Sequence, residues 1–244
     1  MALLEVAASS LASALAAQAG GAGRVELCGH LADGGVSPSY GLVATARDRL
    51  RIPLYVLVRP RGGDFLYDDA EFDVMRRDIK ACVRLGCDGV VIGALDAGAA
   101  VDLAGCRVLM AAAGRLGVTF HRAFDATRDP ARALEDVIAL GCERVLTSGG
   151  CRSALDGAEH IAALVQRAAG RIRVMAGAGV RPQNVAELLA RSRADEVHAS
   201  ARSLHMTGMR WRNERLEDLA ADWQETDPAI VAALMAALAE PGKS

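Results

Sequence analysis

The sequence has almost no lysine, no apolar run long enough to cross a membrane, and no cysteine pair with C-x-x-C spacing. Lys80 lies inside a helical pattern and Lys243 near the end of the sequence, so no lysine stands at a strand end to form a Schiff base with a carbonyl substrate. Because no apolar run is long enough for a membrane-spanning helix, a membrane is not an expected partner. The spacing of the six cysteines indicates free thiols in a reducing compartment.

Charge gives a second set of exclusions. The net charge is −2, acids and bases are mixed along the chain, and no dense basic stripe could neutralise several phosphates, so nucleic acid is not an expected partner. The stretch from Met1 to Glu5 lacks a basic region and carries an acid within its apolar run, unlike a signal peptide. We expect a cytoplasmic protein.

What the sequence does contain is one unit repeated along its length. Short β-branched runs alternate with longer Ala- and Leu-rich segments that have helical periodicity. The predicted strands are Leu3 to Ala8, Arg24 to Cys28, Leu54 to Arg59, Gly89 to Leu95, Gly117 to His121, Arg144 to Ser148, Ile172 to Gly177 and Glu196 to Arg202. Eight strands, each followed by a helix, predict an α/β fold of the TIM-type (β/α)8 barrel class. A doubly wound open sheet is the alternative, because it shows the same local alternation.

Local signals agree with this alternation. Asp129-Pro130 is typical of a helix start, Arg181-Pro182 is interpreted in the same way, and Gly86 and Gly141 stand where helices should end. No polar linker divides the chain, so we expect a single barrel domain over 1–244. An irregular segment is expected at about 203–227, followed by a C-terminal helix.

The run from Arg59 to Phe65 is the densest candidate site. It combines Arg59, Arg61 and Asp64 with two glycines directly after a predicted strand. Arginine forks bind carboxylate or phosphate groups, and glycine lets the backbone approach a ligand closely. A tight turn closed by an Arg–Asp pair explains the same residues.

Other polar residues are predicted at the carboxyl ends of strands, where barrels build their active sites. Alternation places Glu26 and Cys28 on one inward face, and His121 ends the fifth strand. Each has a structural alternative: an interior ion pair for Glu26, a small buried hydrophobe for Cys28 and a satisfied core residue for His121.

The last three strands favour an anion site. Their ends carry glycine and polar residues that could cradle a phosphate, and these candidate ligand-binding residues are Ser148, Gly177, Gly179, His198, Ser200 and Arg202. With Arg59 and Arg61 they form an electropositive pocket for a small anionic ligand, in which Glu26, His121 and Asp64 are available for proton transfer.

Several long motifs resemble the CutC family across nearly the whole chain: Leu3 to Val6, Arg24 to Cys28, Gly34 to Ser39, Arg59 to Phe65, Val118 to Asp125, Arg144 to Gly149, Met175 to Val180 and Met209 to Asn213. The resemblance implies a TIM-type barrel, a cytoplasmic setting, a homodimer and an association with copper homeostasis. It also suggests Cu(I) binding at Cys28. Family members often carry a second cysteine after the first Leu-Glu-Val, where this chain has Ala7.

Three hypotheses therefore stand at this point. The chain is a CutC-type protein that binds Cu(I) through Cys28, or a barrel enzyme acting on a small phosphorylated or carboxylated metabolite through Glu26 or His121. A regulatory barrel that binds a ligand without chemistry is the third. The sequence alone does not say whether it is an enzyme.

Overall fold

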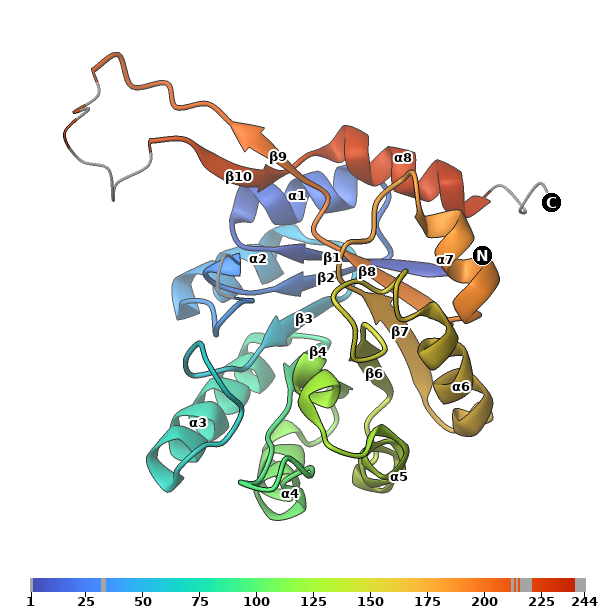
Figure 1. The fold of residues 1–244 in the computed structure, drawn as a ribbon. Helices are drawn as coiled ribbons and strands as arrows, with labels where there is room; N and C mark the ends of the chain where they lie inside the picture. The colour runs from blue at the N-terminus through green and yellow to red at the C-terminus, as the bar shows by residue number, and fades with distance from the viewer. Residues whose placement is uncertain (1, 32–33, 212, 214, 216–220, 240–244) are drawn as a thin grey trace.

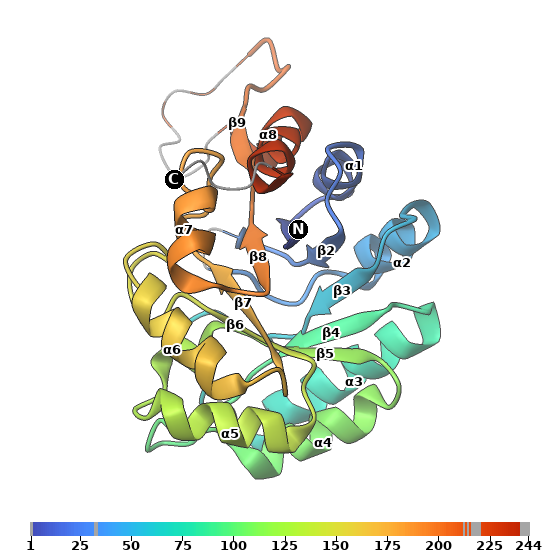
Figure 2. The ribbon, with the colours of Figure 1, turned by 90° about the vertical axis from the view of Figure 1, so that its right-hand side faces the viewer.

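The computed structural model describes residues 2–31, 34–211, 213, 215 and 221–239. Eight parallel strands follow one another around a closed barrel, and helices cover its outside (Figure 1, Figure 2). The barrel strands are β1 (Leu3–Ala8), β2 (Arg24–Leu27), β3 (Leu54–Leu57), β4 (Gly89–Ile92), β5 (Gly117–Phe120), β6 (Arg144–Thr147), β7 (Arg173–Gly177) and β8 (Glu196–Ala199). The predicted TIM-type barrel is confirmed, and the open sheet is excluded.

The helices alternate with the strands along the chain. They are α1 (Leu11–Ala19), α2 (Tyr40–Arg49), α3 (Asp69–Leu85), α4 (Leu103–Ala113), the 3-10 helix η2 (Arg122–Ala126), α5 (Pro130–Leu140), α6 (Ala158–Ala168), α7 (Val185–Ser192) and α8 (Pro228–Ala239). None of the described helices combines the length and the apolar character needed to span a bilayer.

Helix boundaries follow local chemistry in most places. The Asp129 side chain accepts a hydrogen bond from the backbone N–H of Arg132, and Pro130 occupies the first helical turn of α5. The prediction that a helix starts at Arg181-Pro182 was wrong, because α7 begins only at Val185. The Arg181 N–H instead bonds to the Asn184 side chain at 2.8 Å, which closes a turn before the helix.

Most of the core lies between the barrel and its helices. Alternate strand residues such as Leu4, Val6 and Val25 are fully buried there, and Phe120 and Phe124 are its largest side chains. This layer fixes the strands, and with them the residues that point into the barrel.

Inside the barrel, the end nearer the strand N-termini is filled by Tyr55 and charged residues. A Cβ atom at Gly89 or Gly117 would lie 2.1 or 2.0 Å from Tyr55 atoms, so both glycines make room for this ring. The guanidinium groups of Arg24 and Arg144 lie 5.2 and 4.8 Å from its centroid, as in cation–π pairs.

These two arginines are neutralised by buried carboxylates. Arg24 forms ion pairs with both Glu5 and Glu196, and the Nε of Arg144 lies 3.2 Å from an oxygen of Glu196. An ion pair with an interior arginine was the structural alternative for Glu26, but Glu5 and Glu196 form these pairs instead. Glu26, one layer nearer the open end, is left for another role.

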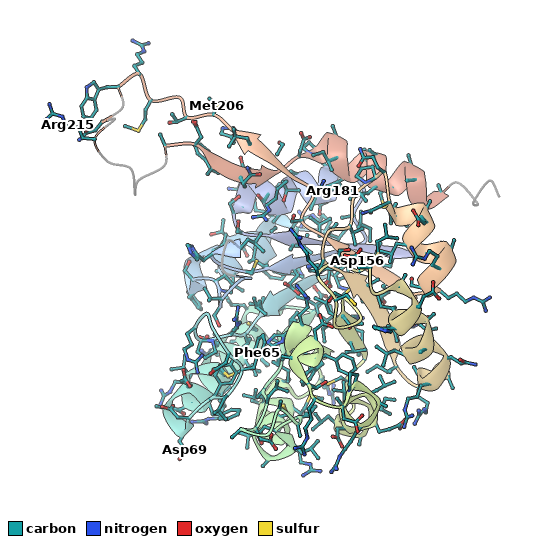
Figure 3. The ribbon with its side chains drawn as sticks, viewed as in Figure 1. Phe65, Asp69, Asp156, Arg181, Met206 and Arg215 are labelled. Atoms are coloured by element: carbon teal, nitrogen blue, oxygen red, sulfur yellow. The ribbon has the colours of Figure 1, made fainter. Side chains whose placement is uncertain are left out.

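The segment expected to be irregular contains an antiparallel pair of strands, β9 (Arg202–His205) and β10 (Trp223–Thr226), which projects from the barrel as an arm (Figure 1). Met206 and Arg215 lie on this arm, away from the barrel (Figure 3). The arm exposes several large apolar side chains, namely Leu204, Met206, Met209, Trp211 and Trp223.

Candidate active site

Two adjoining cavities open at the carboxyl ends of the strands. The first has a volume of about 380 Å³ and is lined by Glu26, Leu31, Gly34, Leu57, Arg59, Phe65, His121, Arg122, Asp125, Ala126, Leu146 and His198. The second has a volume of about 610 Å³ and shares Leu31, Gly34, Arg122 and His198 with the first. Together they are large enough for a small metabolite, and they lie where barrels of this class carry out chemistry.

Glu26 and His198 line the first cavity, and the fully buried Glu5 lies beside them. One ligand-type atom of each lies within 4.8 Å of the others. Strand register brings them together, because Glu5 is the partner of His198 across the β1–β8 junction and Ala7, two residues on, is the partner of Glu26 on β2. The Nδ1–H of His198 donates to Glu5 at 2.8 Å, so Glu5 fixes the orientation of the ring.

The first-strand carboxylate Glu5 is held ionised. Burial alone would raise its pKa, but the hydrogen bond from His198 and the charges of Arg24 and His198 outweigh burial and hold the pKa of Glu5 at about 2. The pKa of His198 is raised in return. Burial by itself would lower the pKa of His198, but the charge on Glu26 and the hydrogen bond to Glu5 raise it by more.

Glu26 has the opposite character. It is 6% exposed, and its Oε2 has no hydrogen-bond partner among the described residues. Burial raises the pKa of Glu26 to about 7, and the nearby Glu5 charge acts in the same direction. A carboxyl group that titrates near neutral pH is suited to both taking up and releasing a proton.

His121 stands on the opposite wall as a neutral imidazole. It caps η2, and its Nδ1 accepts the backbone N–H of Ala123 at 3.1 Å. Burial lowers the pKa of His121 to about 3, and the charge of Arg59 contributes. Its Nε2 is buried and has no hydrogen-bond partner in the part of the chain that is described.

Two arginines make the first cavity electropositive. Arg59 is buried, donates to the carbonyl oxygens of Gly35 and Gly63 at 2.9 and 2.7 Å, and lies over the ring of Phe65. Arg122 lines both cavities, and its Nε lies 2.8 Å from Asp125.

The second cavity carries the predicted anion loops. Gly179 and Ser200 line it together with two further arginines, Arg181 and Arg202. Phe65 and Arg181 mark the two loops that bring side chains to the first and the second cavity (Figure 3). Among the described residues, the two cavities are lined by four arginines but by only two carboxyl groups, Glu26 and Asp125, and Asp125 is already paired with Arg122. This excess of positive charge favours an anionic ligand.

Arg202 reaches this cavity by a different route from the predicted one. It was expected to share a strand face with His198 and Ser200, but β8 ends at Ala199 and Ala201 adopts a left-handed backbone with φ 46°. Arg202 begins the arm instead.

Five predicted site residues, Cys28 and the four described next, are not among those that line the cavities. Arg61 and Asp64 form an exposed ion pair at 2.9 Å, and Arg61 also pairs with Glu71 on α3. These contacts match the alternative explanation of the run, a turn closed by an Arg–Asp pair. The Ser148 hydroxyl is buried against Asp125 and Arg122. Gly177 provides space, because a Cβ there would lie 2.6 Å from Leu146 and 3.1 Å from His198.

Sequence reasoning missed Glu5 as a site residue. Its signal was an acid in the middle of an apolar strand, on the same face as Ala7. Its partner His198 lies 193 positions away and is reached only because β8 closes the barrel against β1.

Comparison with known proteins identifies the family. The model of the CutC family matches residues 2–203. The chain belongs to the CutC family. It is 61% identical over 235 residues to a family protein CutC from Xanthomonas axonopodis pv. citri, covering 96% of this chain and 98% of the relative. A relative of the same name from Xylella fastidiosa is 60% identical over 237 residues, covering 97% and 89%.

A solved structure from Streptococcus agalactiae, named for CutC and copper homeostasis, superposes with a TM-score of 0.79. It is 34% identical and covers 82% of this chain and 99% of its own. The family name thus connects this chain with copper homeostasis.

Cys28 is a poor fit to a Cu(I) site. Its thiol is fully buried and donates to the carbonyl oxygen of Ala8 at 3.5 Å. Burial raises the pKa of the thiol and so disfavours the thiolate that binds metal. The side chains of its cluster, which are Tyr55, Leu57, Val91 and Leu31, contain no sulfur. A two-coordinate soft ion needs a second soft ligand.

The group of Glu5, Glu26 and His198 offers harder donors. Glu5, however, already neutralises Arg24 and accepts from His198. A bound cation would compete with Arg24 and with the His198 N–H for Glu5. Glu26 is the member of the group whose Oε2 has no hydrogen-bond partner among the described residues. This arrangement suits proton transfer better than metal ligation.

Proposed function

We propose that this CutC-family protein is an enzyme that acts on a small phosphorylated or carboxylated metabolite by acid–base chemistry, with Glu26 as the residue that carries the proton. The observation that carries the proposal is the state of Glu26: buried at the cavity floor, without a hydrogen-bond partner for Oε2 within the described chain, and with a pKa of about 7. A purely structural carboxyl group in this position would be costly.

The surroundings of Glu26 support the same role. The hydrogen bond to Glu5 orients His198, and the raised pKa of His198 favours its protonated form, whose charge lowers the pKa of Glu26. Glu5 is a positioning residue in this scheme, because it acts through His198.

The arginines support the choice of substrate class. Arg59 and Arg122 line the first cavity, and Arg122, Arg181 and Arg202 line the second. A planar guanidinium group binds phosphate or carboxylate with two parallel hydrogen bonds. We infer that the anionic end of the substrate occupies the second cavity and the reacting carbon the first.

A direct Cu(I) role through Cys28 has less support, because the lone buried thiol lacks a soft neighbour in its cluster. The copper association is a property of the family name, and an enzyme whose metabolite affects copper tolerance is compatible with it. Six unpaired cysteines support a cytoplasmic location, which is part of the proposal.

The test is a conversion screen. Wild type and Glu26→Gln are incubated with a panel of small phosphates and carboxylates, with and without carbonyl groups, and products are followed by ³¹P and ¹H NMR. Glu159→Gln, at an exposed position on α6, is the matched control. We expect conversion of a panel member by wild type and control but not by Glu26→Gln. Binding without any conversion would favour the regulatory barrel.

A further inference from the structure

We propose that the substrate carries a carbonyl group, that Glu26 removes a proton from the carbon next to it, and that the Nε2–H of His121 donates a hydrogen bond to the carbonyl oxygen. This inference rests on the proposed function and deepens it, because it names both the substrate class and the partner of Glu26 in the reaction.

The tautomer of His121 carries the argument. The backbone N–H of Ala123 points at Nδ1 from 3.1 Å, and an N–H can only donate, so Nδ1 must be the unprotonated nitrogen. In a neutral imidazole the proton then resides on Nε2. The backbone at the start of η2 thereby fixes His121 as a donor toward the cavity.

The ring has little freedom to change this state. Phe65 packs against it with 5.1 Å between ring centroids, and a Cβ at Gly93 would lie 2.5 Å from its Cε1 and Nδ1 atoms. Protonation of Nδ1 would set two donors against each other at Ala123, and the neighbouring Arg59 charge further opposes an imidazolium. His121 is therefore held as a neutral hydrogen-bond donor.

A buried hydrogen-bond donor or acceptor without a partner costs stability unless a ligand supplies the missing partner. Glu26 Oε2 and His121 Nε2 are two such atoms, one acceptor and one donor, on residues that line the same cavity of about 380 Å³. A carbonyl compound in this cavity can use both, since its oxygen accepts from Nε2 and the C–H beside its carbonyl gives its proton to Glu26. A neutral imidazole paired with a carboxylate base is a known solution for proton transfer next to a carbonyl.

The step balances without an outside oxidant. The C–H bond next to the carbonyl breaks, and its proton goes to Oε2 of Glu26. The bonding pair forms a C=C bond, and the carbonyl π pair moves to the oxygen, where the His121 N–H and the Arg59 charge stabilise the enolate. Return of the proton to the same carbon restores the carbonyl group and regenerates Glu26, and in D2O the returning hydrogen is deuterium.

The experiment is hydrogen–deuterium exchange in D2O, followed by ¹H NMR. Probes are dihydroxyacetone phosphate, glyceraldehyde 3-phosphate, pyruvate and 2-oxoglutarate, with glycerol 3-phosphate as the carbonyl-free control and samples without protein for spontaneous exchange. Wild type is expected to exchange the hydrogens next to the carbonyl of at least one probe at least about 100-fold faster than the protein-free sample.

Variants separate the roles of the two residues. Glu26→Gln should lower the exchange rate by at least about 100-fold. His121→Phe keeps the ring packing but removes the donor, and should lower it by about 100-fold. His121→Gln places an amide N–H near the Nε2 position and should recover part of the loss, which a merely structural role for His121 would not produce. Circular dichroism confirms that each variant is folded.

The outcomes distinguish the two proposals. Conversion of a panel compound with no exchange beside a carbonyl, or no exchange with any of the carbonyl probes, overturns the enolate inference. In the first case the acid–base function survives if Glu26→Gln still abolishes conversion. Exchange that persists in Glu26→Gln overturns both proposals, and equal rates in His121→Phe and wild type overturn the role of His121.

Discussion

Replacing Glu26 by glutamine should stabilise the folded protein, and more so at high pH. The pKa of Glu26 is about 7 in the folded protein against an ordinary 4.5. At a pH between these two values, the Glu26 carboxyl group is ionised in the unfolded chain but still protonated in the folded chain. Stability attributable to Glu26 therefore falls as pH rises from about 4.5 to about 7 and stays low above that window. Glutamine cannot ionise and escapes this loss.

The magnitude follows from the two pKa values. One pKa unit corresponds to about 1.4 kcal/mol, so the ionised carboxylate costs the folded state about 3 kcal/mol at pH 8 and about 1 kcal/mol at pH 5. The difference between the two conditions, about 2 kcal/mol, is the robust quantity, because contributions of glutamine itself that do not depend on pH cancel in it.

Urea denaturation of wild type and Glu26→Gln at pH 5 and pH 8 measures this difference. We expect the variant to gain about 2 kcal/mol more at pH 8 than at pH 5. The exposed Glu159→Gln variant should show no such dependence. A gain that is equal at the two pH values would refute the reasoning, because it would mean that Glu26 is not a buried carboxyl with a raised pKa.

Other predictions follow from the same structure. Glu5→Gln should destabilise the protein by about 3 kcal/mol at pH 7, since it removes one of the two carboxylate charges that pair with the buried Arg24 and also the charge that His198 faces; an unchanged urea midpoint would contradict this. Gly93→Ala should displace the His121 ring and lower kcat by about 10-fold or more, whereas Gly41→Ala, which adds a Cβ in open space, should not. A Cu(I) titration of the reduced protein against a competing chelator should give no tight binding that depends on Cys28, so wild type and Cys28→Ala should behave alike. Tight binding by wild type that disappears in Cys28→Ala would restore the direct copper role. Analytical ultracentrifugation should give a homodimer, the state expected from the family resemblance, and a monomer at micromolar concentration would contradict that expectation.

The barrel was predictable because its signals are local. Eight apolar runs alternate with helical segments, and helix boundaries such as Asp129-Pro130 and Gly141 are set by capping chemistry within a few residues. The positions of Glu26, His121 and His198 at the cavity were predictable for a related reason. They stand at or near strand ends, where strand alternation and barrel geometry determine the direction of a side chain.

The remaining features depend on contacts that no local pattern encodes. Arg61 was assigned to the pocket because of its neighbours in sequence, yet it turns outward to Glu71, a residue of the following helix. Arg202 was assigned to a strand face, but the left-handed residue Ala201 ends the alternation before it. Glu5 acquires its role only when the last barrel strand closes against the first.

The central claim is that Glu26 carries the proton in catalysis. Its most direct test compares kcat and Kd for wild type and Glu26→Gln on the panel compound that wild type converts, with Kd from calorimetry. The account predicts a fall in kcat of at least about 100-fold with Kd changed by less than about 3-fold, because glutamine preserves shape but cannot accept the proton. Equal kcat values in the two proteins would contradict it.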